Sequence, residues 1–117
     1  MRKLLLSSVL IASSVQAQQV TSGSGAVLRA LDKTSGLTTE IEVGRGQAFE
    51  LGRLQVALND CRYPAGNPAG NAYAEMEISE TGRAGTLFSG WMIASAPALS
   101  ALEHSRYDIW VMRCITS

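Results

Sequence analysis

The sequence has few of the residues on which several functions depend. It contains one histidine, His104, so any imidazole chemistry must use that ring. The chain contains ten basic and ten acidic residues. Without Arg2 and Lys3 it has eight basic and ten acidic residues, a net charge of about −2. Nucleic acid and anionic lipid require clustered Lys and Arg, which this chain lacks. We therefore predict no nucleic-acid partner, no metal and no other cofactor.

The one long apolar run stands near the start, from Leu4 to Val15, after two basic residues. It is about a dozen residues long, whereas a helix needs roughly 20 to cross a bilayer. Small residues at Val15 and Ala17 suit signal peptidase. We therefore predict a signal peptide over residues 1–17 and a periplasmic mature protein without a membrane span. An uncleaved membrane anchor is the alternative.

Only two cysteines are present, Cys61 and Cys114, and no C-x-x-C motif occurs. In an exported chain the compartment is oxidising, so two cysteines are expected to pair. We predict a structural disulfide between them. A metal site and a redox pair are the alternatives, although zinc would need more ligands nearby.

After a leader predicted to be flexible over residues 18–25, the apolar residues of the remaining single domain, 26–117, recur with a period of two. This period is typical of β-strands with one buried face. The turn sequence Asp32–Gly36 separates two such runs, which predicts a hairpin of Ala26–Leu31 with Leu37–Val43.

Two later runs, Thr86–Met92 and Tyr107–Cys114, carry apolar residues on both faces. This pattern favours central strands that are covered on two sides and hold the core. The chain as a whole predicts a mostly β protein, a small antiparallel β-sandwich or barrel-like domain.

Between these runs the sequence predicts one short helix near residues 96–103. Ser95 would be its N-cap, and Pro97 would occupy its first turn, where a missing N–H costs nothing. Leu99 and Leu102, three residues apart, would share the face that packs on the sheet.

Three segments together resemble a bacterial family of small exported proteins, domain-of-unknown-function family 2155. They are Leu31–Gly36, Phe49–Val56 with Cys61, and Leu87–His104 followed by Tyr107–Val111. The resemblance implies export, the cysteine pair and a single domain, and it implies no reaction or ligand. The chain departs from the family pattern after Cys61, in a region often richer in Pro and Glu, and at Ser105, where a Pro is common.

The chemistry that His104 offers has three interpretations. As the cap of the predicted helix its ring would meet the free carbonyl groups of the last turn. It could instead contact a ligand, or form a serine-hydrolase triad with Ser89 or Ser100 and Asp108. The triad interpretation is weak, because Phe88-Ser89-Gly90-Trp91 lacks the first glycine of a nucleophile elbow.

Trp91 and Trp110 also have two interpretations. Their apolar neighbours favour packing in the core, whereas aromatic faces with a polar group also suit a groove for a sugar or a peptide. Tyr63 and Tyr73 flank a loop rich in Gly and Pro and are better candidates for exposure.

From these observations we predict a non-enzymatic periplasmic module that binds or braces an envelope protein partner. The expected contact surface is the 95–104 segment and its approaches. Its residues are Ser95, Ser100, Glu103, His104, Trp91 and Tyr107. The alternatives are a module that binds carbohydrate or cell-wall fragments and, third, a serine-type hydrolase.

Overall fold

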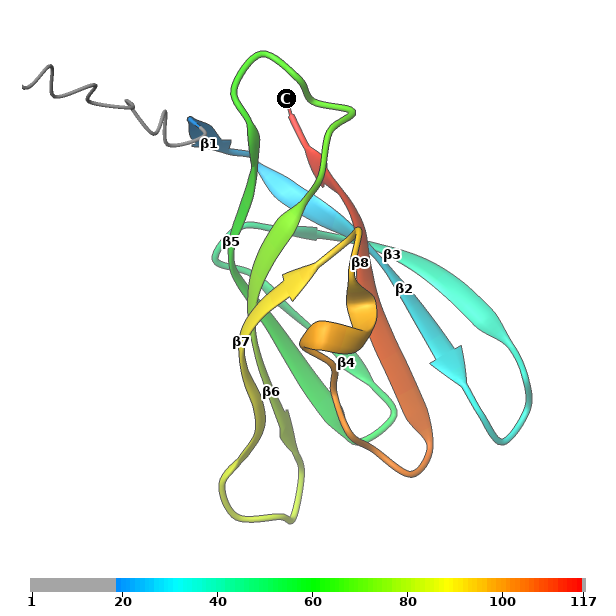
Figure 1. Ribbon diagram of the computed structural model, residues 1–117. Helices are drawn as coiled ribbons and strands as arrows, with labels where there is room; N and C mark the ends of the chain where they lie inside the picture. Colours follow the sequence, from blue (N-terminus) through cyan, green and yellow to red (C-terminus); the bar gives the residue numbers. More distant parts are fainter. Residues whose placement is uncertain (1–18, 117) are drawn as a thin grey trace, which may run out of the picture.

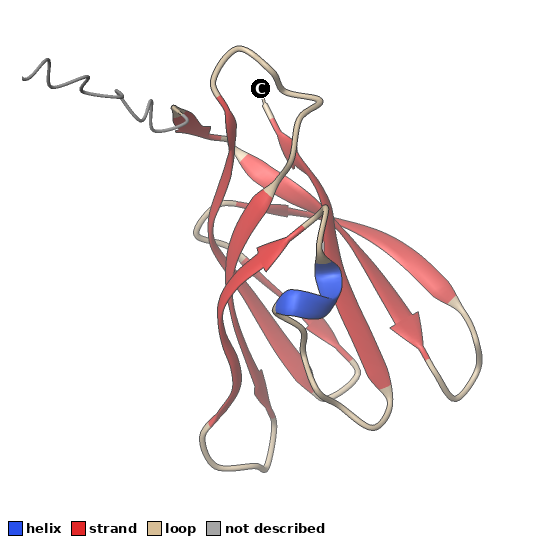
Figure 2. Ribbon diagram, in the orientation of Figure 1, coloured by secondary structure: helices blue, strands red, loops and turns tan. Residues whose placement is uncertain are grey.

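The protein is a sandwich of two antiparallel sheets in a computed structural model that describes residues 19–116 (Figures 1 and 2). The predicted signal peptide lies outside the described residues. The first sheet has the strand order β1-β5-β6-β7, with β4 also paired to β5, and the second has the order β3-β2-β8. The elements are β1 Val20–Ser22, β2 Gly25–Asp32, β3 Thr38–Gly44, β4 Ala48–Leu51, β5 Leu54–Pro64, β6 Tyr73–Glu80, β7 Thr86–Ile93, the 3₁₀ turn η1 Pro97–Leu99 and β8 Tyr107–Ile115.

The core lies between the two sheets and follows the period of two. Every second side chain of β5, β6 and β2 is buried there, whereas residues such as Gln55 and Glu77 between them are exposed. The buried residues of these three strands include Leu54, Val56, Leu58, Ala74, Met76, Ile78, Ala26, Leu28 and Ala30. The predicted fold class is confirmed, in its sandwich form.

The predicted hairpin is confirmed as β2 and β3. Seven consecutive residue pairs join the strands in register, from Gly25 with Gly44 to Leu31 with Thr38. The Asp32 carboxylate accepts a hydrogen bond from the Thr34 amide, and Gly36 has φ +75, so both turn residues act as their types predict.

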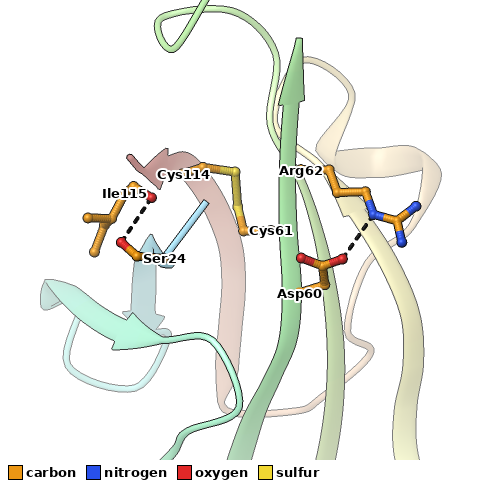
Figure 3. Close-up of a disulfide and its surroundings, with 6 residues drawn as sticks. All are labelled: Ser24, Asp60, Cys61, Arg62, Cys114 and Ile115. Carbon is orange, nitrogen blue, oxygen red and sulfur yellow. Dashed lines mark hydrogen bonds and ion pairs between the residues drawn. A yellow bond between two sulfur atoms is a disulfide. The ribbon is translucent and has the colours of Figure 1, made fainter. Parts of the chain in front are cut away.

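Cys61 and Cys114 form the predicted disulfide, with 5.7 Å between their Cα atoms and 53 positions between them in sequence. The bond joins β5 of one sheet to β8 of the other (Figure 3). Both cysteines are buried in the core. The two sheets are therefore linked covalently as well as by packing.

The prediction that Thr86–Met92 and Tyr107–Cys114 are central strands is wrong. They form β7 and β8, and each lies at the end of its sheet, while β5, β6 and β2 are central. The second apolar face of β8 is covered by η1 and the chain after it, which Figure 1 shows beside this strand. A segment packed on the outer face of an end strand thus produces the same two-faced apolar pattern as a central strand that is covered by a layer on each side.

The short helix predicted near residues 96–103 is present with Pro97 in its first turn, but it is shorter than expected, because Pro97–Leu99 alone forms a 3₁₀ turn. Ser95 does not cap it, since both its amide and its hydroxyl are bonded to Asn71. Leu102 is 4% exposed in the core, whereas Leu99 is 79% exposed, so the two leucines share no face. No helix in the described range is long and apolar enough to cross a membrane.

The interval predicted to be a flexible leader contains strand structure. Val20–Ser22 forms β1, which pairs with Arg62–Pro64 of β5, and the Gly23 amide donates to the Cys61 carbonyl. Gly25 already belongs to β2. The prediction failed because small polar residues can pair as an edge strand through their backbone alone, without an apolar pattern.

Candidate functional site

Three turns meet at one end of the sandwich around a cavity of about 280 Å³. They are the β4–β5 turn, the β6–β7 turn and the segment that leads into β8, which contribute Arg53, Arg83 and Arg106 respectively. The Thr81 amide donates to the Arg53 carbonyl at 2.9 Å and so ties the first two turns together. We call this cavity the arginine-rimmed pocket.

His104 is fixed in the wall of this pocket, and its side chain is only 9% exposed. Its Nδ1 accepts hydrogen bonds from the backbone amides of Arg106 and Tyr107, at 3.1 and 3.2 Å. The ring proton therefore resides on Nε2, which lies 3.3 Å from Oε2 of Glu80 and donates to it. The ring also stacks on Tyr107, with 5.7 Å between centroids.

The prediction that His104 caps a helix is therefore wrong, since no helix precedes it directly. The ring instead organises the turn that follows it, by accepting two amides of that turn. It also positions Glu80, whose Oε2 lies 3.5 Å from Nη1 of Arg83. One arginine of the rim is thus held through a carboxylate that the histidine orients.

A second carboxylate, that of Asp32, holds Arg106. The two side chains form two hydrogen bonds, Nε to Oδ1 at 3.3 Å and Nη2 to Oδ2 at 3.1 Å. The hydrogen bond from Arg106 lowers the pKa of Asp32, and this effect outweighs the opposing desolvation. The third arginine, Arg53, has no acidic partner among the described residues. Its charge is the uncompensated one at the rim.

The β2–β3 turn clamps the same segment from the other side. Lys33 donates through Nζ to the His104 carbonyl at 2.7 Å, and its amide donates to the Arg106 carbonyl at 2.8 Å. Its ammonium also lies 3.5 Å from the Asp108 carboxylate. All three segments that carry the family resemblance therefore converge on this end of the molecule.

The residues predicted as one contact surface do not lie together. His104 and Tyr107 line the arginine-rimmed pocket, but Ser95 is bonded to Asn71 and Ser100 follows η1. Glu103 is exposed and lines none of the cavities described here. Several residues of the 95–104 segment therefore attach it to the rest of the fold and do not form an exposed surface: Ser95 is bonded to Asn71, and Leu102 is buried in the core.

Trp91 lies in a different cavity, of about 220 Å³, which we call the aromatic hollow. It is lined by Val20, Arg62, Tyr73 and Trp91 and shares no residue with the arginine-rimmed pocket. The Arg62 guanidinium lies 4.9 Å from the centroid of the Trp91 ring. Trp91 is half-buried at the surface, so the interpretation that it packs in the core is wrong.

Arg62 is itself positioned by Asp60, whose Oδ2 accepts from Nε at 2.9 Å (Figure 3). Burial raises the pKa of the Asp60 carboxyl, but hydrogen bonds from Arg62 and Ser22 outweigh it and the net shift is downward. The carboxylate therefore remains a firm acceptor for Arg62.

The triad considered for a hydrolase is not assembled. The ring nitrogens of His104 face two backbone amides and Glu80, and the Asp108 carboxylate pairs with Lys33. Ser89 is exposed on β7, paired in register with Glu77 of β6. The absence of catalytic activity stays a prediction.

Sequence reasoning missed Arg53, Arg83 and Glu80. The signal that could have found the two arginines is their position directly beside turn glycines, Gly52 and Gly82, where a long side chain must leave the sheet. Which turns meet in space depends on strand order, and the sequence does not contain strand order explicitly.

Comparison with known proteins identifies a family that this chain matches. Residues 26–114 match the family described as "Uncharacterized protein conserved in bacteria (DUF2155)". The chain belongs to this family. The match runs from the second residue of β2 to the disulfide cysteine of β8, so it covers every strand except β1 and every turn of the arginine-rimmed pocket.

One curated relative of this DUF2155 chain is the uncharacterized protein RP359 of Rickettsia prowazekii (strain Madrid E). It is 30% identical over 90 residues, which cover 73% of this chain and 57% of the relative. The chain thus spans little more than half the length of that relative. No solved structure matches.

Proposed function

We propose that this chain is an exported, non-enzymatic binding module that holds an acidic group of an envelope protein in the arginine-rimmed pocket. The observation that carries the proposal is that three arginines from three separate segments line one cavity. Two of them are held by carboxylates, and Arg53 remains uncompensated. A guanidinium presents a planar fork of donors that matches a carboxylate.

The cavity, of about 280 Å³, has room for a protein side chain or a chain end. Its volume lies near the lower limit of sites for drug-sized ligands, which measure about 300–1,000 Å³. A pocket of this kind at the end of a sandwich can receive one acidic residue while the surrounding turns contact the rest of the partner. Export is supported by the sequence of residues 1–17 and by the disulfide, which persists in oxidising compartments.

The test is photocrosslinking in the native envelope, with a photoreactive amino acid at position 53 or at position 45. Arg45 is the matched control, because it is exposed in the β3–β4 turn and lines none of the cavities described here. We expect a discrete protein adduct from position 53 only, in the periplasmic fraction. The absence of adducts from position 53, or the same adducts from both positions, would overturn the proposal.

A titration of the purified protein tests the chemistry of the site. An acidic peptide should bind the wild type, and R53Q should weaken binding about tenfold while R45Q leaves it unchanged, since a charged hydrogen bond contributes about 1.5–3 kcal/mol. A peptide with Gln in place of its acidic residues should not bind. Equal affinity for the acidic peptide and its Gln counterpart would show that binding to the pocket does not depend on the charge of the peptide.

A second candidate function, binding of carbohydrate or cell-wall fragments, is favoured by the aromatic hollow. Two aromatic side chains and an arginine held by Asp60 line it, a combination of apolar surface and fixed donors that suits a sugar. Tryptophan fluorescence during titration with such fragments tests it. The emission of W110F, which retains Trp91, should respond, whereas that of W91F should not.

A further inference from the structure

Strand β3 presents a long free edge. It is the outermost strand of its sheet and pairs only with β2 among the described residues (Figure 1). Its seven residues pair in register without a bulge, and the strand contains neither Pro nor Lys. A regular edge of this kind leaves a row of backbone N–H and C=O groups available to another strand.

The other edges of the sandwich carry features that hinder such pairing. β1 and β4 have only three and four residues. β7 is paired to β6 across a register shift and contains Gly90 at φ +157. β8 pairs with β2 across a register shift, and Pro97 and Ala101 of the segment beside it line a cavity together with Trp110 of that strand. Short, irregular and covered edges are the means by which proteins prevent strand addition, and β3 has none of them.

The charges of β3 disfavour a second copy of this chain as the added strand. Side chains on the same face of two antiparallel strands lie directly opposite one another. In the registers that overlap most, two copies of β3 would place Glu40 opposite Glu42, or one of these residues opposite its own copy. Like charges in such positions destabilise the pair.

The same charges favour a basic strand. Glu42 is exposed and has no ion-pair partner among the described residues, and Glu40 shares its carboxylate with Arg29 at 2.9 Å. Between them Ile41 faces the core side and is half-buried against the core. An added strand would therefore gain from basic residues opposite the two glutamates and an apolar residue opposite Ile41.

We propose that the free edge of β3 accepts an extended segment of a partner protein in which an apolar residue stands between two basic residues. Backbone hydrogen bonds to the edge would supply binding, and the alternating side chains would supply specificity. This surface uses neither the arginine-rimmed pocket nor its residues, so it does not depend on the function proposed above.

Three synthetic peptides of equal length test the proposal on the purified, disulfide-bonded protein. The first contains Lys-Val-Lys at its centre, the second Glu-Val-Glu and the third Lys-Pro-Lys, because proline removes a backbone donor and does not fit a ladder. We expect the first to bind and to protect β3 amides from hydrogen exchange. The other two should bind at least about tenfold more weakly, a factor that corresponds to about 1.4 kcal/mol.

Variant E42K should reverse the preference between the Lys and Glu peptides, while E77K, on the exposed face of β6, should leave it unchanged. Equal binding of the Lys-Pro-Lys peptide would show attraction by charge without strand addition and would overturn the proposal. Equal effects of E42K and E77K, or protection of amides elsewhere, would do the same. Self-association of the protein with protected β3 amides would identify a second copy as the occupant and also overturn it.

Discussion

The phenol of Tyr107 lies directly against Gly52, so that a Cβ atom at position 52 would collide with the Tyr107 hydroxyl group. Gly52 also has φ +56, a backbone conformation that L side chains rarely adopt. Both residues line the arginine-rimmed pocket. The contact therefore fixes the β4–β5 turn, which carries Arg53, against the start of β8.

We expect G52A to destabilise the protein by about 2–5 kcal/mol, as the sum of backbone strain of about 1–2 kcal/mol and an overpacking cost of about 1–3 kcal/mol. G46A is the matched control, because Gly46 has φ +79 and nothing within 4 Å of its Cβ position. It should show the strain alone. Urea denaturation measures both variants, and removal of the hydroxyl in G52A/Y107F should recover part of the difference. Equal costs for G52A and G46A would contradict the collision.

The disulfide should contribute more to stability than any single side chain. Its 53-residue separation corresponds to about 4 kcal/mol in the chain-entropy account, and removal of native disulfides from small domains costs about 2–5 kcal/mol. We expect C61A/C114A to lose stability in this range, measured by thermal or urea unfolding. A reducing agent should destabilise the wild type and leave the variant unchanged. If reduction left the wild type unaffected, the bond would not be structural.

Local signals predicted the strands and the first hairpin, whereas relationships between distant segments were not predictable. Alternation in β6 and the Asp32–Gly36 turn identify their elements because each depends on neighbours in sequence. The length and the N-cap of the helix predicted near residues 96–103 were not predictable, because Ser95 is bonded to Asn71, 24 positions away. Strand order decides which turns meet, so Arg53 and Arg83 could not be joined with His104 from the sequence alone.

His104 should be a structural residue, in contrast to its exposed neighbour Glu103. H104A removes the acceptor for two backbone amides and the stacking on Tyr107, and we expect a loss of about 1–3 kcal/mol. E103A should change stability by less than about 0.5 kcal/mol, because that side chain is exposed. Urea denaturation compares the two.

Two conservative variants separate the roles of the two ring nitrogens of His104. H104N retains an acceptor near the position of Nδ1, and H104Q retains a donor near that of Nε2. Because Nδ1 serves two amides and Nε2 serves one carboxylate, H104N should keep more stability than H104Q. The opposite order would show that the bond to Glu80 dominates.

The pairing of Asp32 with Arg106 predicts how stability depends on pH. Arg106 lowers the pKa of Asp32 in the folded protein below its ordinary value of 3.8. A carboxyl with a depressed folded pKa stabilises the protein above its unfolded pKa, and this contribution is lost as the pH falls through the folded pKa. The wild type should therefore exceed D32N in stability at neutral pH, and the difference should shrink below about pH 4.

D32N suits this test because the Asn oxygen can still accept the Thr34 amide that closes the β2–β3 turn, so the variant removes the charge and keeps the turn. Urea denaturation of both proteins at neutral pH, near pH 4 and near pH 2 measures the difference. R106Q should remove the largest share of the same pH-dependent part and leave the share due to the backbone amides of Thr34 and Ser35, whereas D32N/R106Q should lose no more of it than D32N alone. A difference that persists at the lowest pH would show that Asp32 acts through the geometry of its turn and not through its charge.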